Sequence, residues 1–299
     1  MRTDRSTYPT EHLPNSYVSR RSTEAQAFST WTPPTGVLGA LTDEARARAA
    51  TLLPRAAELK SAVTGLASVP PFAAALQGTD VKVVAEVKRS SPSRGVINRD
   101  LDLETQVVAY EAGGAAAVSI LTEPMRFGGS NEDLSRARGA VRLPLLKKDF
   151  HVEPVQILEA RALGASAALV IARAVSPSRL AELLSAGIDA GIEILVEVRD
   201  ERELDLALTL GAGLIGVNNR NLETLEIDPD TSLRILPLIP GDIVAIAESG
   251  VRSVQDVERL GRAGANAVLV GSEVSASSDP EAAVRSLTGV PRTTGARKS

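Results

Sequence analysis

The segment from Ala263 to Gly271 reads AGANAVLVG, and nearly the same phrase occurs three more times in the chain. The other copies are AGGAAAVSI from Ala112, LGASAALVI from Leu163 and LGAGLIGVN from Leu210. Each copy starts with small residues typical of a turn and continues into an apolar, β-rich stretch, which predicts the entry to a buried strand. A phrase that recurs within one chain indicates an internally repeated fold.

Further apolar segments lie between these copies and bring the expected strands to eight. They span residues 81–87, 115–121, 143–147, 167–172, 192–198, 214–217, 243–247 and 267–270. A helix-like amphipathic stretch follows each one, as in parallel α/β architectures. The repeated phrase introduces every second strand, which favours a closed (β/α)8 barrel, or TIM barrel, whose layers of inward side chains come from alternate strands. The alternative is an open doubly wound sheet, but no G-x-G-x-x-G follows the first strand.

The barrel pattern divides the chain into three parts. Residues 1–35 are rich in Ser, Thr, Pro and Arg and predict a disordered or loosely packed N-terminal arm. A transit peptide is an alternative interpretation of this arm, which its acidic residues oppose. Residues 36–289 are expected to form a single barrel domain that begins with helices, kinked near Pro54, before the first strand. Residues 290–299 are expected to be a loose tail.

Composition narrows the chemistry that the barrel can perform. The chain has no cysteine, which excludes a thiolate metal site or thiol nucleophile and suits the reducing cytoplasm. Its two histidines, His12 and His151, cannot form a polyhistidine metal site, and His151 is expected at a helix entry. A net charge of −4 opposes nucleic-acid binding, and no apolar run is long enough for a membrane span. Acid-base chemistry is therefore expected from Lys, Glu or Asp.

Charged residues stand at the carboxyl ends of the expected strands, where the active sites of such barrels lie. Glu86 and Lys88 share one face of the first strand, and burying both charges is costly unless a polar substrate meets them there. Lys148 follows the third strand and Glu197 lies near the end of the fifth. A lysine and a glutamate that converge shift each other's pKa and can serve as acid and base. The alternative is a set of structural ion pairs.

The loops after the last two strands are short and made of small residues. They contain Ser249-Gly250 and Gly271-Ser272, whose backbone N–H groups can approach a ligand closely. This is the usual phosphate-binding position of the fold. The alternative is that the glycines only make tight turns, but the nearby charge of Lys88 favours phosphate.

These residues lie in phrases that resemble the indole-3-glycerol phosphate synthase family. The phrases are AEVKRSSPSRG from Ala85, LTEPMRFGGS from Leu121, LPLLKKDF from Leu143, LVEVRDEREL from Leu195, IGVNNRNLETLEID from Ile215 and VAIAESGVRS from Val244. The resemblance runs from about Val37 to Leu287 in the family's order. Sibling phosphate-binding barrels share the ESG and terminal glycine loops, but not the E-x-K-x-x-S-P-S or K-K-D-F phrases.

The resemblance implies a carboxy-lyase of tryptophan biosynthesis. Such an enzyme converts 1-(2-carboxyphenylamino)-1-deoxyribulose 5-phosphate to indole-3-glycerol phosphate, with release of carbon dioxide and water. By the same resemblance Lys148 is the general acid, Glu197 the base that assists dehydration, and Lys88 a cation that holds the substrate carboxylate or phosphate. A small phosphorylated substrate is the implied partner, no metal or organic cofactor is required, and a monomer is expected.

The resemblance also assigns supporting residues. It implies that Glu86, Asn218 and Glu248 orient the lysines and the substrate oxygens, and that Ser91 and Arg220 make further polar contacts. The phosphate is expected to bind at Ser249, Gly250, Gly271 and Ser272. The anthranilate ring is expected to contact Phe127, Phe150, Leu169 and Leu222. The chain departs from the family at Glu273-Val274-Ser275, where small residues and Leu-Met are usual. A carboxylate at Glu273 would weaken phosphate binding unless it turns outward.

Two other functions use the same residues. A Schiff-base aldolase would use Lys88 or Lys148 as its nucleophile, and a covalent adduct trapped by borohydride would reveal it. A non-catalytic sensor would need the phosphate loops alone, so the presence of Lys88, Lys148 and Glu197 together counts against it.

Overall fold

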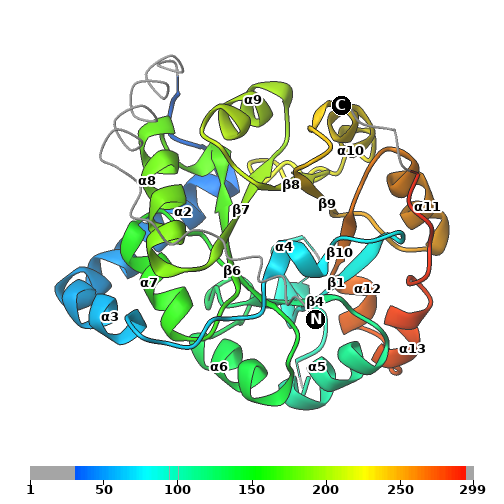
Figure 1. Ribbon diagram of the computed structural model, residues 1–299, viewed down its shortest axis with the longest axis horizontal. Helices are drawn as coiled ribbons and strands as arrows, with labels where there is room; N and C mark the ends of the chain where they lie inside the picture. The colour runs from blue at the N-terminus through cyan, green and yellow to red at the C-terminus, as the bar shows by residue number, and fades with distance from the viewer. Residues whose placement is uncertain (1–30, 94, 100, 294–299) are drawn as a thin grey trace, which may run out of the picture.

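The computed structural model describes residues 31–293 except 94 and 100, and its centre is a closed parallel barrel (Figure 1). The barrel strands are β1 (Lys82–Val87), β4 (Ala117–Leu121), β5 (Leu145–Lys148), β6 (Ala167–Ile171), β7 (Glu193–Val198), β8 (Leu214–Asn218), β9 (Val244–Glu248) and β10 (Ala267–Val270). Because β1 pairs with both β4 and β10, the sheet closes on itself. The predicted (β/α)8 barrel is confirmed, and the open doubly wound sheet is excluded.

Helices form a ring around the barrel. They are α5 (Leu103–Ala112), α6 (Asn131–Ala140), α7 (Pro154–Ala162), α8 (Pro177–Ala190), α9 (Glu201–Thr209), α10 (Asp230–Ile235), α11 (Val254–Arg262) and α13 (Pro280–Arg285), with the short α12 (Ser272–Ser275) after β10. Several begin at a residue whose side chain accepts a hydrogen bond from a backbone N–H of the first turn, such as Asp102, Ser130 and Ser253. These caps satisfy donors that the helix itself leaves unpaired.

The repeated phrase marks the junction between a helix and the strand that follows it. The glycine at its turn adopts a positive φ in each copy, at Gly114, Gly164, Gly211 and Gly264. The next residue, always alanine, donates its N–H to a carbonyl of the helix's last turn: Ala115 to Tyr110, Ala165 to Ala160, Ala212 to Ala207 and Ala265 to Leu260. Glycine makes this left-handed helix ending accessible, so the repeat encodes one kind of turn used four times.

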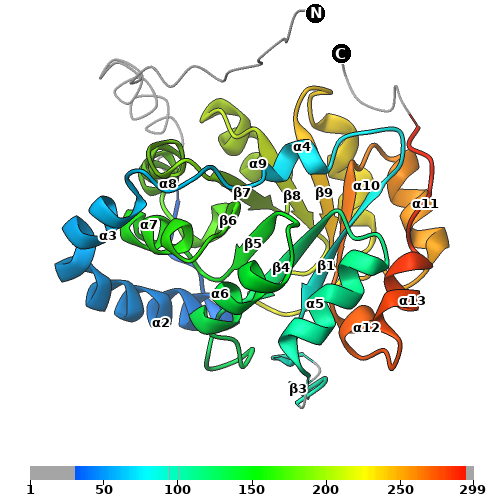
Figure 2. The ribbon, with the colours of Figure 1, turned by 60° about the horizontal axis from the view of Figure 1, so that its bottom comes forward.

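The N-terminal extension contacts both ends of the barrel. Its elements are α2 (Gly36–Leu52), the 3-10 turn η2 (Leu53–Arg55), α3 (Ala56–Val63) and α4 (Phe72–Ala75), and the predicted kink near Pro54 lies in η2. Figure 2 shows α2 at the same end as the hairpin of β2 (Ser90–Ser91) and β3 (Gly95–Val96), while α4 lies at the opposite end. Glu193 at the start of β7 accepts the N–H groups of Phe72 and Ala73 and so anchors α4.

Adjacent lysines of β5 occupy different environments. Lys147 is buried and its Nζ lies 2.5 Å from Oε2 of Glu159 on α7, on the helix side of the barrel wall. His151, which precedes α7 as predicted, is also buried and contacts the carbonyl of Leu169 through Nδ1. Lys148 belongs to the carboxyl end of the strand and has the cavity described below beside it.

Within the described part of the chain, no helix is both long and apolar enough to cross a bilayer.

Candidate active site

A cavity opens at the carboxyl ends of the barrel strands, beneath the first turns of α2. Twelve of the predicted site residues line it: Glu86, Lys88, Ser91, Phe127, Lys148, Phe150, Leu169, Glu197, Asn218, Arg220, Leu222 and Ser249. Val37 and Leu41 of α2 also line it, and the sequence analysis did not single them out. Their spacing of four residues on one helix face was a signal that could have identified them.

Glu86 bridges two lysines at the floor of this cavity. Its Oε1 lies 3.4 Å from Nζ of Lys88, and its Oε2 lies 3.4 Å from Nζ of Lys148. Lys148 has a second carboxylate partner, because Oε2 of Glu248 lies 3.3 Å from the same Nζ. Ser119 on β4 donates a hydrogen bond of 3.3 Å to Glu86 Oε2. The opening of this network to the cavity explains how the first strand can carry two charges on one face.

Two glycines make room for the buried carboxylates. A Cβ atom at Gly216 on β8 would lie 2.3 Å from Oε1 of Glu248. A Cβ atom at Gly271, just after β10, would lie 2.6 Å from Oε1 of Glu86. Both separations are well inside van der Waals contact, so any larger residue would displace the carboxylate. Gly271, predicted as part of a phosphate loop, therefore also shapes the floor of the cavity.

The two lysines have opposite pKa shifts because their surroundings differ. Burial lowers the pKa of Lys88, and the single carboxylate of Glu86 only partly offsets that effect. Burial also opposes the charge on Lys148, but Glu86 and Glu248 outweigh it and raise the pKa of Lys148 above its ordinary value. Burial alone would raise the pKa of Glu86, yet the two ammonium groups hold it below the usual range. Lys148 is thus a stable ammonium, and Lys88 gives up its proton more easily.

Glu197 on β7 has a raised pKa, and burial also raises the pKa of its neighbour Glu248. Burial, reinforced by the charge of Glu248, raises the pKa of Glu197 to about 8, although Lys148 opposes the shift. Asn218 on β8 donates from Nδ2 to Glu197 Oε1 at 2.9 Å. The Oδ1 of Asn218 accepts the N–H of Arg220 at 2.9 Å, which fixes the orientation of the amide. The site therefore pairs a permanent ammonium with a carboxyl group that ionises near neutral pH.

An apolar wall faces the charged floor. The rings of Phe127 and Phe150 lie 6.4 Å apart between centroids and are tilted by 39°. The Nζ of Lys88 lies 5.7 Å from the centroid of Phe127, within the range of a cation–π contact. Leu169 and Leu222 line the same cavity. A flat aromatic group could lie against this wall with its polar substituents toward the lysines.

The loop after β9 has two consecutive residues in the left-handed backbone conformation. Ser249 and Gly250 both have positive φ, 68° and 87° respectively, and Asn219 holds the loop by donating to the Ser249 carbonyl at 2.9 Å. Asn219 was missing from the sequence analysis, although it stands next to Asn218 in the quoted IGVNNRN phrase. Ser249 lines the cavity, whereas Gly250, Gly271 and Ser272 are absent from its described lining. Glu273 lies in the first turn of α12.

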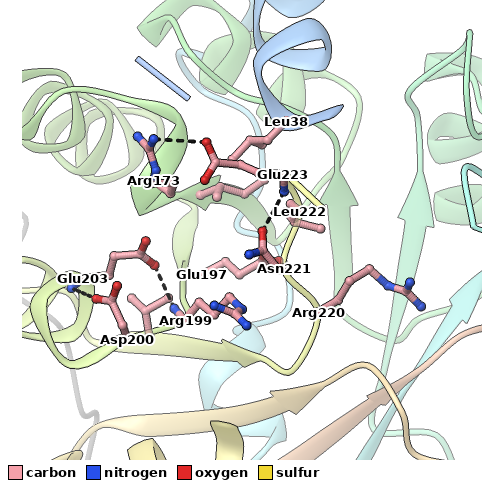
Figure 3. A pocket seen from close by; sticks show the side chains of 12 residues that line it. Leu38, Arg173, Glu197, Arg199, Asp200, Glu203, Arg220, Asn221, Leu222 and Glu223 are labelled. Atoms are coloured by element: carbon pink, nitrogen blue, oxygen red, sulfur yellow. Dashed lines mark hydrogen bonds and ion pairs between the residues drawn. The ribbon is translucent and has the colours of Figure 1, made fainter. Parts of the chain in front are cut away.

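A second pocket adjoins the cavity (Figure 3), and the two share Ile171, Glu197, Arg220 and Leu222. Arg173, on the turn after β6, faces Glu223 in the loop after β8, with 3.1 Å between Nη2 and Oε1. The same arginine donates from Nη1 to the carbonyl of Thr32 at 2.6 Å. Residues 31–35 of the predicted N-terminal arm are therefore in contact with the barrel, while residues 1–30 lie outside the described residues. The domain boundaries remain a prediction.

Known proteins resemble this chain over most of its length. The sequence model of the family described as indole-3-glycerol phosphate synthase matches residues 41–287, most of the chain. The chain belongs to the indole-3-glycerol phosphate synthase family. An indole-3-glycerol phosphate synthase of Mycolicibacterium gilvum is 50% identical over 214 residues, covering 72% of this chain and 79% of that protein. Indole-3-glycerol phosphate synthase 2 of Streptomyces coelicolor is 45% identical over 258 residues, covering 85% of this chain and 99% of that protein.

Solved structures support the fold independently of family membership. The structure of 3-hexulose-6-phosphate synthase from Salmonella typhimurium aligns with a TM-score of 0.56 and 16% sequence identity. The alignment covers 69% of this chain and 96% of that one. Identity this low says nothing about activity, but it confirms that the barrel is a known architecture.

Proposed function

We propose that the chain is an indole-3-glycerol phosphate synthase: it closes the ring of 1-(2-carboxyphenylamino)-1-deoxyribulose 5-phosphate and releases carbon dioxide and water. The observation that carries this proposal is the ammonium of Lys148, held between Glu86 and Glu248 on the floor of a cavity whose wall is aromatic. In a chain of this family, that geometry supports a proton donor that lies opposite a surface suited to the anthranilate ring. The product serves tryptophan biosynthesis.

Lys148 acts as the general acid of ring closure. The aromatic carbon that bears the carboxylate attacks the substrate carbonyl, and the carbonyl oxygen takes a proton from Lys148 as the carbon–carbon bond forms. Loss of carbon dioxide returns its bonding electrons to the ring. Glu86 and Glu248 raise the pKa of Lys148 despite its burial, so the donor is protonated at neutral pH, and the negative charge that develops on the carbonyl oxygen drives the transfer.

Glu197 acts as the base of the dehydration. It removes the proton whose loss, together with departure of the hydroxyl group as water, completes the indole. A carboxylate whose pKa is about 8 is a much stronger base than an exposed glutamate once it is ionised. Asn218 donates a hydrogen bond to one of its oxygens and so orients the carboxyl group.

The remaining site residues hold the substrate. The ring packs against Phe127, Phe150, Leu169 and Leu222, with Val37 and Leu41 of α2 covering it. Lys88 binds the substrate carboxylate or phosphate, and Ser91 and Arg220 supply further polar contacts. The phosphate lies at Ser249, Gly250, Gly271 and Ser272, where backbone N–H groups are its main donors. We place the reaction in the cytoplasm and expect the protein to act as a monomer.

The decisive experiment mixes the purified protein with the anthranilate–ribulose phosphate substrate and follows indole absorbance and carbon dioxide release. Formation of both products in equal amounts supports the proposal. Absence of indole, with a lysine adduct trapped by borohydride, would instead support a Schiff-base aldolase. We expect no adduct at Lys148, because a lysine held as an ammonium is a poor nucleophile.

A further inference from the structure

Strand β1 continues past the last residue pair that it forms with β10. Beyond that pair, a single hydroxyl group makes the hydrogen bonds to the β1 backbone. The ladder between the two strands ends with Ala85 opposite Val270. Beyond it, Oγ of Ser275, at the end of α12, donates to the carbonyl of Glu86 at 2.8 Å and accepts the N–H of Lys88 at 3.1 Å. In a parallel ladder, one residue of the neighbouring strand bonds a C=O and the N–H two residues further on. Ser275 supplies both bonds with one side chain.

A tyrosine on one of the helices around the barrel also takes part in this contact. The hydroxyl of Tyr110 on α5 lies 3.1 Å from the Glu86 carbonyl and 3.1 Å from Ser275 Oγ. Tyr110 and Ser275 are both fully buried. Each hydroxyl has one proton, so Ser275 donates to Glu86 while Tyr110 shares its proton between the Glu86 carbonyl and Ser275 Oγ. All the polar atoms of this buried group are thereby satisfied.

The short helix that carries Ser275 is itself fixed. Gln106 on α5 donates from Nε2 to the carbonyl of Val274 at 3.2 Å, and Asn98 donates from Nδ2 to the carbonyl of Ser275, also at 3.2 Å. Val274 is fully buried. The Ser275 hydroxyl is therefore presented from a rigid support, and movement of α12 would be transmitted directly to the end of β1.

We propose that Ser275 is a positioning residue for Glu86 and Lys88, with Tyr110 as its partner. It bonds the backbone on both sides of Val87, and the side chains of the two bonded residues form the lysine–carboxylate network of the cavity floor. Fixing this short stretch sets where the Glu86 carboxylate meets Lys148. The inference rests on the proposed function, because its effect is measured on that reaction.

The test compares Ser275→Ala with Ser275→Thr and Tyr110→Phe. Ser275→Ala removes the hydrogen bonds of the hydroxyl to the backbone of Glu86 and Lys88 and its contact with Tyr110, so kcat should fall on the order of tenfold while KM changes less than about threefold. Ser275→Thr keeps the hydroxyl and should recover most of that loss. Tyr110→Phe keeps the aromatic ring and should reduce kcat less than Ser275→Ala does. In the double variant the two losses of kcat should not add, because the two hydroxyls share an acceptor.

Ser166→Ala is the matched control. Ser166 is as deeply buried and also bonds a strand, since its Oγ accepts the N–H of Leu145, but it does so at the opposite end of the barrel. It should leave kcat unchanged. Hydrogen exchange of the Lys88 amide gives a readout independent of catalysis. It should be faster than in the wild type in Ser275→Ala, but not in Ser275→Thr or Ser166→Ala.

Three results would overturn the proposal: wild-type kcat in folded Ser275→Ala, an equal loss in Ser166→Ala, or no recovery in folded Ser275→Thr. If Ser275→Ala does not fold, Tyr110→Phe decides, and unchanged kcat in that variant counts against the proposal. A wild-type protein that makes no indole would refute the proposed function. The amide exchange of Lys88 would still report on the positioning contact in that case.

Discussion

Two consecutive lysines show how much one position along a strand changes the role of a residue. Lys147 and Lys148 point to opposite faces of β5, so Lys147 meets Glu159 of α7 and Lys148 meets Glu86 and Glu248 of the cavity floor. The first contact joins a strand to a helix. The second holds a charge where a substrate can reach it.

Exchanging these two lysines for methionine should separate stability from catalysis. Lys148→Met should lower kcat by about 10²–10⁴-fold with a small change in KM, because the variant loses the proposed general acid and keeps the proposed phosphate and ring contacts. Lys147→Met is the control: it leaves the Glu159 carboxylate unpaired and should lower the melting temperature but keep kcat. Steady-state kinetics and thermal unfolding of both variants check this. A large loss of kcat in folded Lys147→Met would contradict the assignment.

The shifted pKa of Glu197 predicts how stability depends on pH. In the folded protein Glu197 keeps its proton up to about pH 8, against an ordinary value of 4.5. The folded state therefore binds more protons in this interval, and the stabilisation from this group is lost as pH rises through 8. Glutamine cannot ionise, so Glu197→Gln does not lose this stabilisation. The melting temperature of the variant minus that of the wild type should therefore increase by roughly 4 °C or more between pH 5 and pH 9.

Glu258→Gln on α11, which is exposed, is the control for this measurement. Its melting temperature should differ from the wild type by the same amount at each pH. A Glu197→Gln curve that runs parallel to the wild type would show that Glu197 is already ionised at pH 5. The same variant should slow the dehydration step in single-turnover experiments and let a ring-closed, decarboxylated intermediate accumulate.

At the scale of elements, α2 is held to the rim of the barrel by Arg48. Its Nη2 lies 2.6 Å from Oδ1 of Asp149, directly after β5, and its Nη1 lies 3.7 Å from Glu123, after β4. Asp149 also accepts from Thr122 Oγ1 at 2.8 Å. These bonds keep the part of α2 that covers the cavity close to the two strand ends.

Arg48→Met should therefore reduce the free energy of unfolding by about 1–2 kcal/mol, since it removes the ion pair of the buried Asp149 with Arg48, while the partial exposure of Arg48 limits the cost. It should also raise KM, because Val37 and Leu41 lie on the same helix. Arg46→Met removes an exposed pair with Asp43 and should change the free energy by less than about 0.5 kcal/mol. Denaturant titrations measure both, and equal losses would show that Arg48 is no anchor.

At the scale of the whole molecule, the contacts of residues 31–35 determine how far the N-terminus can be shortened without loss of stability or activity. Removing residues 1–30 should leave the melting temperature and kcat close to those of the full chain. Removing residues 1–35 also removes the bonds from Arg173 to Thr32 and from Thr35 to Glu223, and it should lower the melting temperature and raise KM. Equal behaviour of the two truncations would show that these bonds contribute nothing. A loss already present without residues 1–30 would contradict the predicted loose arm.

The sequence by itself determined the barrel and the residues that stand at its mouth. Strands and helix ends are local features: alternation places Glu86 and Lys88 on one face, and a glycine before alanine produces the same turn at Gly114, Gly164, Gly211 and Gly264. Because the carboxyl ends of parallel strands meet at one end of a barrel, Lys148, Glu197 and the two phosphate loops followed from their positions at the strand ends, whereas the residues expected to contact the ring were implied only by the family resemblance.

Only the tertiary structure decided which of these residues meet and how their charges respond. The contact between Lys148 and Glu248, the pKa of about 8 at Glu197 and the bridge from Ser275 to β1 join residues from distant parts of the chain. Their distances depend on how the strands are staggered and how helices such as α12 pack, to which every element contributes. A pKa depends on burial and on charges within a few ångströms, and spacing along the chain does not specify either quantity.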